Sequence, residues 1–254
     1  MFSARLLLAG GVLTAIIASP VLATAADGTS AVSTAVLSGI DRRYFYRHQG
    51  RNLDESVEAM EALLAARPDD PALLWRLGRS VVRVGERKQK KERLAAFERA
   101  QGLLEKAVGL DPSNPEAHYW LGVAVGRQGQ LRGIFKSLSL VGVMRREMEA
   151  VLKLDYNHGG AHHVLGEMYR ELPRFVGGSK KKSLAELELA FKLAPDYTAS
   201  YAALAEAYRD LGEDEKAAAV LNRIFEVKTP QDPAEFEDNL KEARELLEKL
   251  GDGR

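Results

Sequence analysis

Apolar side chains along this chain recur at intervals of three and four residues, the spacing that places them on one face of an α-helix. Two segments show the pattern most clearly. Their apolar faces are formed by Ala100, Leu104, Ala107 and Val108, and by Leu184, Leu187, Phe191 and Ala194. Good helix formers, chiefly Ala, Leu, Glu, Lys and Arg, recur throughout, so the sequence predicts an all-α fold.

The helical pattern itself repeats along the chain. Leu-Gly pairs begin at Leu77, Leu121 and Leu165, spaced by 44 residues each time, and Leu204-Ala205 follows 39 residues later. Turn sequences keep the same step, and they begin at Pro68, Pro112, Tyr156 and Pro195. Two independent markers with one period predict a solenoid, in which each repeat buries its apolar face against its neighbours.

Each repeat is predicted to be a hairpin of two helices. Pro71 and Pro115 suit the first turn of a helix, where their missing N–H has no intrahelical partner. Ser183 fits a capping box with Glu186, while Ser179 is a second candidate cap one turn earlier. The small residue after each leucine is glycine in three repeats, and glycine costs about 1 kcal/mol relative to alanine inside a helix. Its recurrence therefore predicts that two helices approach closely at this position.

The two ends of the array have weaker repeat markers. Residues 31–66 are predicted to form an N-terminal hairpin, and Pro233–Leu250 a polar amphipathic helix with the character of a solubilising cap. The apolar face of this last helix is formed by Leu240, Ala243, Leu246, Leu247 and Leu250.

The N-terminus has the features of an export signal. An apolar run over residues 6–22 follows a single positive charge, and Ala23-Thr24-Ala25 is a small-x-small site of the kind that signal peptidase cleaves. We expect a signal peptide over residues 1–25 and a soluble mature protein that begins at Ala26, in the bacterial periplasm. The alternative is a membrane anchor retained in residues 6–22, which is short of the roughly 20 residues that a span requires.

The repeats resemble tetratricopeptide repeats, which have Leu-Gly in the first helix, Ala near the end of the second and a turn such as Asp111-Pro112. At 44 and 39 residues they are longer than the usual 34, so the hairpins are extended or carry insertions. Three segments also resemble the regulator of microtubule dynamics family: Leu73–Arg79, Leu110–Val123 and Leu165–Leu184. The loop in the last of these is similar to one in the tetratricopeptide T component of some TRAP transporters.

The resemblance covers roughly residues 52–228 and implies a right-handed α-solenoid of about five tetratricopeptide-like hairpins with a C-terminal capping helix. The expected organisation is a signal peptide over 1–25, an N-terminal segment with the first helix over 26–50, the repeat domain over 51–230 and the capping helix with a tail over 231–254. The resemblance implies the fold and does not identify the partner, because this repeat binds very different partners.

Composition excludes several classes of function. The chain has 36 basic and 36 acidic residues, whereas a general nucleic-acid binder usually has a basic excess. It has no cysteine, which excludes disulfides, zinc-thiolate and iron–sulfur sites and a cysteine nucleophile. The neutral total conceals an uneven distribution. Residues 72–147 hold 15 basic and 7 acidic side chains, net +8, whereas residues 206–250 hold 7 and 13, net −6.

In tetratricopeptide proteins the first helices line a concave groove, so the resemblance implies that stripes at i, i+4 and i+8 of these helices lie side by side in it. The stripes are aromatic and basic in the early repeats and acidic in the later ones. Trp, Tyr and Arg are the types enriched at binding hot spots. The alternative is a solvated surface with uneven charge. The predicted groove residues are Trp75, Arg79, Arg83, Tyr119, Val123, Arg127, His163, Glu167, Arg170 and Glu206.

Other candidate sites have weaker support. His158 and His162 form an i, i+4 pair, but no acidic ligand lies on the same face, so we predict no metal site and a shared structural role for His162 and its repeat equivalent His118. Residues 177–182, Gly-Gly-Ser-Lys-Lys-Lys, resemble an anion cradle without the spacing of a phosphate-binding loop, and a flexible loop with a solubilising run is the preferred interpretation. No nucleophile, base and acid are brought together, so we predict neither catalysis nor a cofactor.

These features support an exported, non-catalytic scaffold that binds a protein or peptide segment in its groove. The first alternative is a small-ligand carrier, by resemblance to the transporter T component, which predicts an apolar cavity between hairpins. The second is a microtubule-associated regulator, if the N-terminus is a retained anchor. Neither nucleic acid nor a membrane contact outside the N-terminal segment is expected.

Overall fold

The computed structural model describes residues 31–251. The predicted signal peptide, its cleavage site and the alternative anchor lie outside the described residues, as do residues 252–254. Within the described range the chain forms eleven α-helices, two short 3₁₀ helices and no strand. The α-helices are α1 (Thr34–Phe45), α2 (Asn52–Ala66), α3 (Pro71–Glu86), α4 (Lys90–Leu110), α5 (Pro115–Arg132), α6 (Ile134–Leu154), α7 (Gly159–Glu171), α8 (Lys180–Leu193), α9 (Ala199–Arg209), α10 (Asp214–Arg223) and α11 (Phe236–Gly251). The 3₁₀ helices are η1 (Arg174–Val176) and η2 (Ile224–Glu226).

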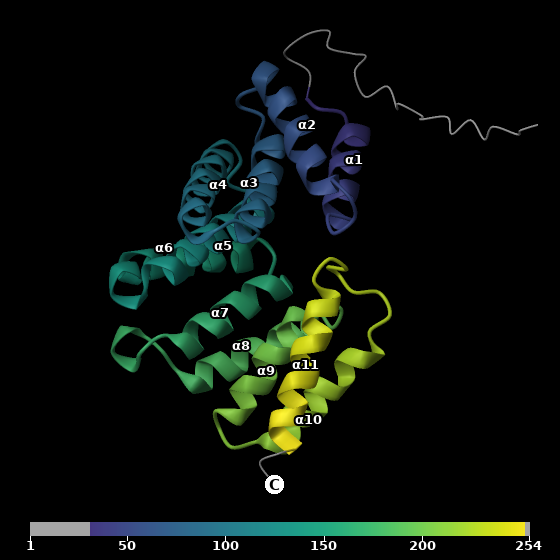
Figure 1. Ribbon diagram of the computed structural model, residues 1–254. Coiled ribbons are helices and arrows are strands. Elements are labelled where there is room, and N and C mark those ends of the chain that lie inside the picture. The colour runs from purple at the N-terminus through teal and green to yellow at the C-terminus, as the bar shows by residue number, and fades with distance from the viewer. Residues whose placement is uncertain (1–30, 252–254) are drawn as a thin grey trace, which may run out of the picture. The chain divides into compact units, whose positions relative to one another are not determined.

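Helices that follow one another in the chain pack as antiparallel neighbours (Figure 1). The pairs α1–α2, α3–α4, α5–α6, α7–α8 and α9–α10 are five hairpins, each of which also packs against the next. The all-α solenoid predicted from the repeat is therefore confirmed. None of the helices in residues 31–251 is both long enough and apolar enough to cross a membrane.

The recurring glycines stand where the two helices of a hairpin approach most closely. A Cβ at Gly78 would lie 2.5 Å from Leu104 Cγ, one at Gly122 2.3 Å from Met148 Cε, and one at Gly166 2.5 Å from Leu187 Cγ. A Cβ at any of the three positions would force these apolar groups to shift, and the side chains that carry them are fully buried. The close approach predicted from the Leu-Gly pairs is thus confirmed.

Helix starts follow the predicted turns, with one correction. α3 begins at Pro71 behind the cap Asp70, and α5 at Pro115 behind the cap Asn114. α8 is capped by Ser179, whose Oγ accepts from the Lys182 N–H at 3.3 Å. The capping box at Ser183 is wrong, because Ser183 lies within α8 with its Oγ buried and without a hydrogen-bond partner in the described chain. Because Ser179 already caps α8, Ser183 lies one turn inside the helix, on its buried face.

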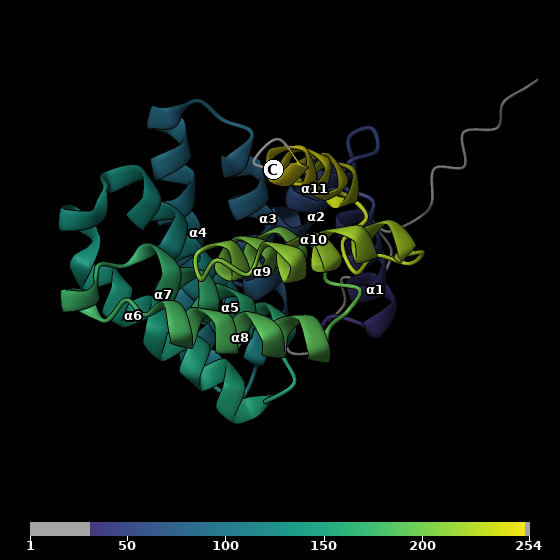
Figure 2. The same ribbon diagram turned by 90° about the horizontal axis from the view of Figure 1, so that it is seen from below.

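The last helix covers the end of the array. α11 packs against α9 and α10 in both views (Figures 1 and 2), and its residues Leu240, Ala243, Leu246 and Leu250 are buried. The helix begins at Phe236 rather than at Pro233, since Pro233 falls in a turn that precedes it. A polar outer face over an apolar inner one is what a capping helix requires.

The same polar clamp closes the turn before two of the hairpins, α5–α6 and α7–α8. His118 Nδ1 lies 2.7 Å from Glu147 Oε2 on the second helix, and its Nε2 lies 3.0 Å from the Pro112 carbonyl oxygen. His162 makes the same two contacts, with Glu186 at 2.7 Å and the Tyr156 carbonyl at 2.9 Å. The predicted shared structural role of the two histidines is confirmed.

The next repeat places Tyr201 at the equivalent position, where its hydroxyl donates to the Pro195 carbonyl at 2.7 Å. In the α3 repeat the equivalent residue is Leu74, and Lys106 Nζ of α4 donates to the Pro68 carbonyl instead, at 2.6 Å. The repeats therefore satisfy the same turn carbonyl with three different side chains.

We predict that Glu186→Gln destabilises the protein more at low pH than at high pH. Burial alone would lower the pKa of His162, but its bonds to Glu186 and to the Tyr156 carbonyl raise that pKa above the ordinary value of 6.5. The ionic hydrogen bond is fully present below the unfolded pKa and is lost as the pH rises through the folded one. We expect a loss of about 1.5–3 kcal/mol in the free energy of unfolding at pH 5.5, and a smaller loss at pH 8.5.

Urea unfolding at the two pH values measures this difference. Glu149→Gln is the matched control, because Glu149 is exposed on α6. An equal loss for Glu186→Gln at both pH values would show that His162 is not charged in the folded protein.

Candidate functional site

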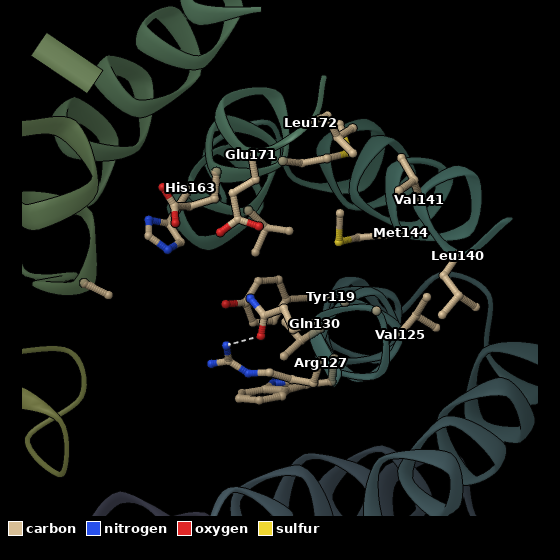
Figure 3. A pocket seen from close by; sticks show the side chains of 18 of the residues that line it. Tyr119, Val125, Arg127, Gln130, Leu140, Val141, Met144, His163, Glu171 and Leu172 are labelled. Atoms are coloured by element: carbon tan, nitrogen blue, oxygen red, sulfur yellow. Dashed lines mark hydrogen bonds between the residues drawn. The ribbon is translucent and has the colours of Figure 1, made fainter. Parts of the chain in front are cut away.

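A cavity of about 350 Å³ opens between α5, α6 and α7 (Figure 3). The packing of α6 on α7 is looser than that of α4 on α5, and the cavity lies at this looser junction between two hairpins. Its inner wall is apolar, and its mouth is polar. The apolar wall is formed by Val125 of α5, by Leu140, Val141 and Met144 of α6, by Val164 and Met168 of α7, and by Leu172 directly after α7.

Side chains from α5 and α7 face each other across the mouth. Tyr119, Arg127 and Gln130 project from α5, while His163 and Glu171 project from α7 (Figure 3). Arg127 Nη1 donates to Gln130 Oε1 at 3.2 Å. These groups offer hydrogen bonds and both signs of charge around an apolar interior, the combination typical of a binding pocket.

His163 has an unsatisfied nitrogen at this mouth. Its Nδ1 is buried and lacks a hydrogen-bond partner among the described residues, and its ring packs edge-on against Tyr197 with centroids 5.4 Å apart. Burial lowers the pKa of His163, and Arg127 lowers it further, so the imidazole is neutral at physiological pH. A buried polar atom without a partner is uncommon, and a bound group could supply the missing hydrogen bond.

The early aromatic and basic stripe is occupied by contacts within the chain. Trp75 is only 7% exposed, and the guanidinium groups of Arg76 and Arg79 stack on its ring. Arg79 Nη2 also donates to Asp41 Oδ1 of α1 at 2.8 Å. Arg79 therefore joins α3 to α1, Trp75 packs under the guanidinium groups of its own helix, and neither residue lines the cavity.

Arg83 belongs to a larger ion-pair network. Its guanidinium, which is mostly buried, pairs with Glu86 at 3.0 Å, with Asp232 at 3.6 Å and with Glu235. Arg47 at the end of α1 pairs with the same two late carboxylates, with Asp232 at 2.6 Å and Glu235 at 3.4 Å. The segment before α11 thus supplies the anions that neutralise the early arginines.

Arg127 extends this network to α5, because its Nε donates to Glu86 Oε1 at 2.9 Å. Arg83 and Arg127 together lower the pKa of Glu86 against the effect of its burial. Breaking a buried pair by removing one partner costs about 3–5 kcal/mol. Charge reversal at Arg83 would therefore disturb the fold, so it is a poor probe of partner binding.

The carboxylates of the later helices are less completely neutralised than the arginines of the early ones. Arg170 bridges Glu167 of α7 and Glu206 of α9, at 3.2 and 2.7 Å. Burial and the nearby Glu167 raise the pKa of Glu171, and burial together with Glu206 and Glu167 raises that of Glu242 on α11. The carboxylates of α7, α9 and α11 repel one another here, so this region favours a cation.

Six of the ten predicted groove residues line the cavity, and four lie elsewhere. The six are Arg83, Tyr119, Val123, Arg127, His163 and Glu167. The four are Trp75, which stacks with Arg79 on α3, Arg79 itself, which pairs with Asp41 of α1, and Arg170 and Glu206, which pair with each other.

The predicted groove omitted five notable lining residues. Glu171 is the i+8 position of the stripe that begins at His163, although it was left out of the predicted groove residues, and Gln130 lies three residues after Arg127 and therefore beside its stripe. Met144, Tyr197 and Glu235 come from a second helix, a turn and the segment before α11. No periodic signal marks those three, since they reach the cavity only through tertiary packing.

The cavity offers an apolar wall, hydrogen-bonding side chains and charges of both signs, all of which serve binding. Within residues 31–251 no three His, Asp or Glu side chains are grouped so that they could hold a metal ion. His158 caps α7 by accepting from the Ala161 N–H at 3.0 Å, and His118 and His162 are held in the hairpin clamps. These three histidines therefore have structural partners.

Comparison with solved structures identifies tetratricopeptide proteins as the neighbours of this fold. TTC0263, a thermophilic tetratricopeptide protein of Thermus thermophilus, superposes with a TM-score of 0.61 and 19% identity, covering 83% of this chain and 97% of that one. The MamA fragment from residue 41 to the end, from Desulfovibrio magneticus RS-1, gives a TM-score of 0.50 and 18% identity, covering 78% and 96%. Identities this low establish the fold alone.

Comparison with curated protein sequences gives no match. Family models do match: residues 198–229 match the tetratricopeptide repeat, the building block of many protein-interaction scaffolds. Residues 42–173 match the model of regulator of microtubule dynamics protein 1-3. Because this second match spans just over half of the sequence, the chain belongs to the regulator of microtubule dynamics protein 1-3 family.

Proposed function

We propose that this protein is a non-catalytic scaffold that holds a segment of a partner protein at the cavity between α5 and α7. The observation that carries the proposal is the cavity itself, an apolar recess with polar side chains at its mouth, one of which, His163, has a ring nitrogen without a partner among the described residues. An apolar side chain of the partner would enter the recess. Its backbone or a polar neighbour would satisfy His163 Nδ1.

The charges around the mouth favour a basic segment over an acidic one. The arginines at positions 79, 83 and 127 already pair with carboxylates of this chain. Glu171 has no comparable partner among the described residues, and its pKa is raised by burial and by Glu167. A lysine or arginine of the partner would relieve this repulsion. We therefore infer a partner segment in which the apolar residue that enters the recess has a lysine or arginine next to it in sequence.

A photo-crosslinking amino acid at position 130 tests this proposal in the full-length protein expressed in its own cells. Gln130 is exposed at the mouth, so a bound segment would lie within reach (Figure 3). We expect discrete protein adducts, identified by mass spectrometry, whose yield falls about tenfold when Val141→Phe fills the recess. Val164→Phe should repeat the effect from the opposite wall.

Leu138→Phe is the matched control, because Leu138 is exposed on the same helix and does not line the cavity. Circular dichroism of each variant checks that the helices are intact. Adducts that are unchanged by both cavity-filling variants, or reduced equally by Leu138→Phe, would exclude the cavity as the binding site.

A small-ligand carrier is the second candidate function, and the same cavity favours it. A volume of about 350 Å³ falls at the lower end of the range for small-molecule pockets. The apolar cavity between hairpins is the feature that this alternative requires. A carrier would need no protein anchor, and the unsatisfied His163 nitrogen would bond to the ligand.

Native mass spectrometry separates the two functions. A carrier purified gently should keep a small molecule that adds a fixed mass, and Val141→Phe should abolish that mass by occupying the recess. A scaffold should show the mass of the polypeptide alone. Retention of a ligand by Val141→Phe would place the ligand outside this cavity.

The location of the protein decides between an exported scaffold and a microtubule-associated regulator. The family name favours the second, and the apolar run before Ala23-Thr24-Ala25 supports the first. An early basic surface that could meet an acidic tubulin surface has little support, since Arg79 and Arg83 are paired within the chain.

We propose export, with the mature protein in the bacterial periplasm, and predict Ala26 as its first residue. N-terminal sequencing of protein recovered from cells tests this directly. Recovery of the intact Met1 end in a membrane fraction would contradict cleavage and would favour the retained anchor.

A further inference from the structure

The turn between α7 and α8 presents an aromatic side chain among basic ones. Phe175, in η1, is 79% exposed, the largest exposure of any large apolar residue in the described chain. Arg174 beside it is exposed, and so are Lys181 and Lys182 in the first turn of α8. We refer to residues 174–182 as the basic loop.

The backbone that follows Phe175 in the basic loop is tightly constrained. Gly177 adopts φ +100°, a left-handed conformation that strains other residues. A Cβ at Gly178 would lie 1.7 Å from the Leu172 carbonyl oxygen, so no larger residue fits there. The Ser179 N–H also donates to the Tyr169 carbonyl at 2.8 Å, which ties the loop back to α7. The loop is therefore built tightly and still points its aromatic ring outward.

The cations of the basic loop are reinforced by a neighbouring helix. Arg145 of α6 and Lys182 both lie over the Tyr169 ring, at 5.8 and 5.4 Å from its centroid. The first turn of α8 contains no acidic residue, so the positive end of the helix dipole adds to this charge. Lys180 is held by Asp210, whereas Lys181 and Lys182 have no ion-pair partner in the part of the chain that the structure describes.

We propose that the basic loop is a docking surface for a bilayer of anionic lipids. Phe175 would enter the headgroup region, while Arg174, Lys181 and Lys182 would face acidic headgroups. Interfacial binding combines a buried apolar group with cations, and each Lys or Arg near an anionic surface contributes to attraction. This contact is separate from the N-terminal segment and from the cavity between α5 and α7.

The shape of the basic loop favours a bilayer over an acidic protein. The ring of Phe175 projects from a turn, whereas a stable protein interface needs about 1,000 Å² of complementary surface. A single projecting ring with a rim of cations matches the headgroup layer, which accepts an isolated side chain without a preformed pocket.

Phe175→Trp in the full-length protein tests the proposal. The native Trp75 and Trp120 are only 7% and 6% exposed, so an added indole at position 175 reports on the loop. With vesicles of phosphatidylcholine and phosphatidylglycerol we expect its emission to move to shorter wavelength and to be quenched by brominated lipid. Vesicles of phosphatidylcholine alone should leave the indole in water, even where the N-terminal segment binds them.

Charge variants in the Phe175→Trp background measure the cationic contribution. Lys181→Gln/Lys182→Gln should weaken partitioning into anionic vesicles about thirtyfold. Lys90→Gln/Lys91→Gln is the matched control, since both lysines are exposed in the first turn of α4, outside the basic loop. The control pair should weaken partitioning into anionic vesicles much less.

Three results would overturn the proposal. They are no spectral shift with anionic vesicles, equal losses for the two lysine pairs, and a shift with polyglutamate but not with vesicles. The last result would instead assign the basic loop to an acidic polypeptide.

Discussion

Each long hairpin of this protein depends on contact between a glycine in its first helix and a large apolar side chain in its second. Gly78, Gly122 and Gly166 leave room for Leu104, Met148 and Leu187, and a single Cβ would collide with them. The helices can therefore pack closely enough to share one apolar layer. Because a solenoid repeat buries its face only against its neighbours, this contact is repeated wherever the chain must continue.

Ion pairs within the chain neutralise the arginines of its early helices, which therefore do not form a free basic surface. The early arginines would form a basic groove if they were free, but Asp41, Glu86, Asp232 and Glu235 neutralise them. Two of these anions come from the segment before α11, at the far end of the sequence. The early basic excess is thus neutralised locally by pairing across the fold, and the carboxylates of α7, α9 and α11 remain the less compensated charges near the cavity.

The cavity and the basic loop, the two surfaces proposed to bind other molecules, have different physical origins. The cavity exists because α6 and α7 belong to different hairpins that pack less closely than their neighbours, so an apolar recess remains between them. The basic loop lies in the turn after α7, which follows a constrained path through Gly177 and Gly178 and leaves Phe175 79% exposed. Packing defines the first surface and backbone conformation the second, so each can change without the other.

The sequence by itself determined the repeat, the hairpins, most helix starts and the glycine contacts, because these depend on local periodicity and on residues within one hairpin. It also predicted the structural role of His118 and His162, since the 44-residue step links them. Only the tertiary structure decided which groove residues are available. Arg47 and Asp232 are 185 positions apart and pair directly, and no periodic pattern records such a contact. The free energy of an ion pair depends on distance and burial, which the folded chain alone defines.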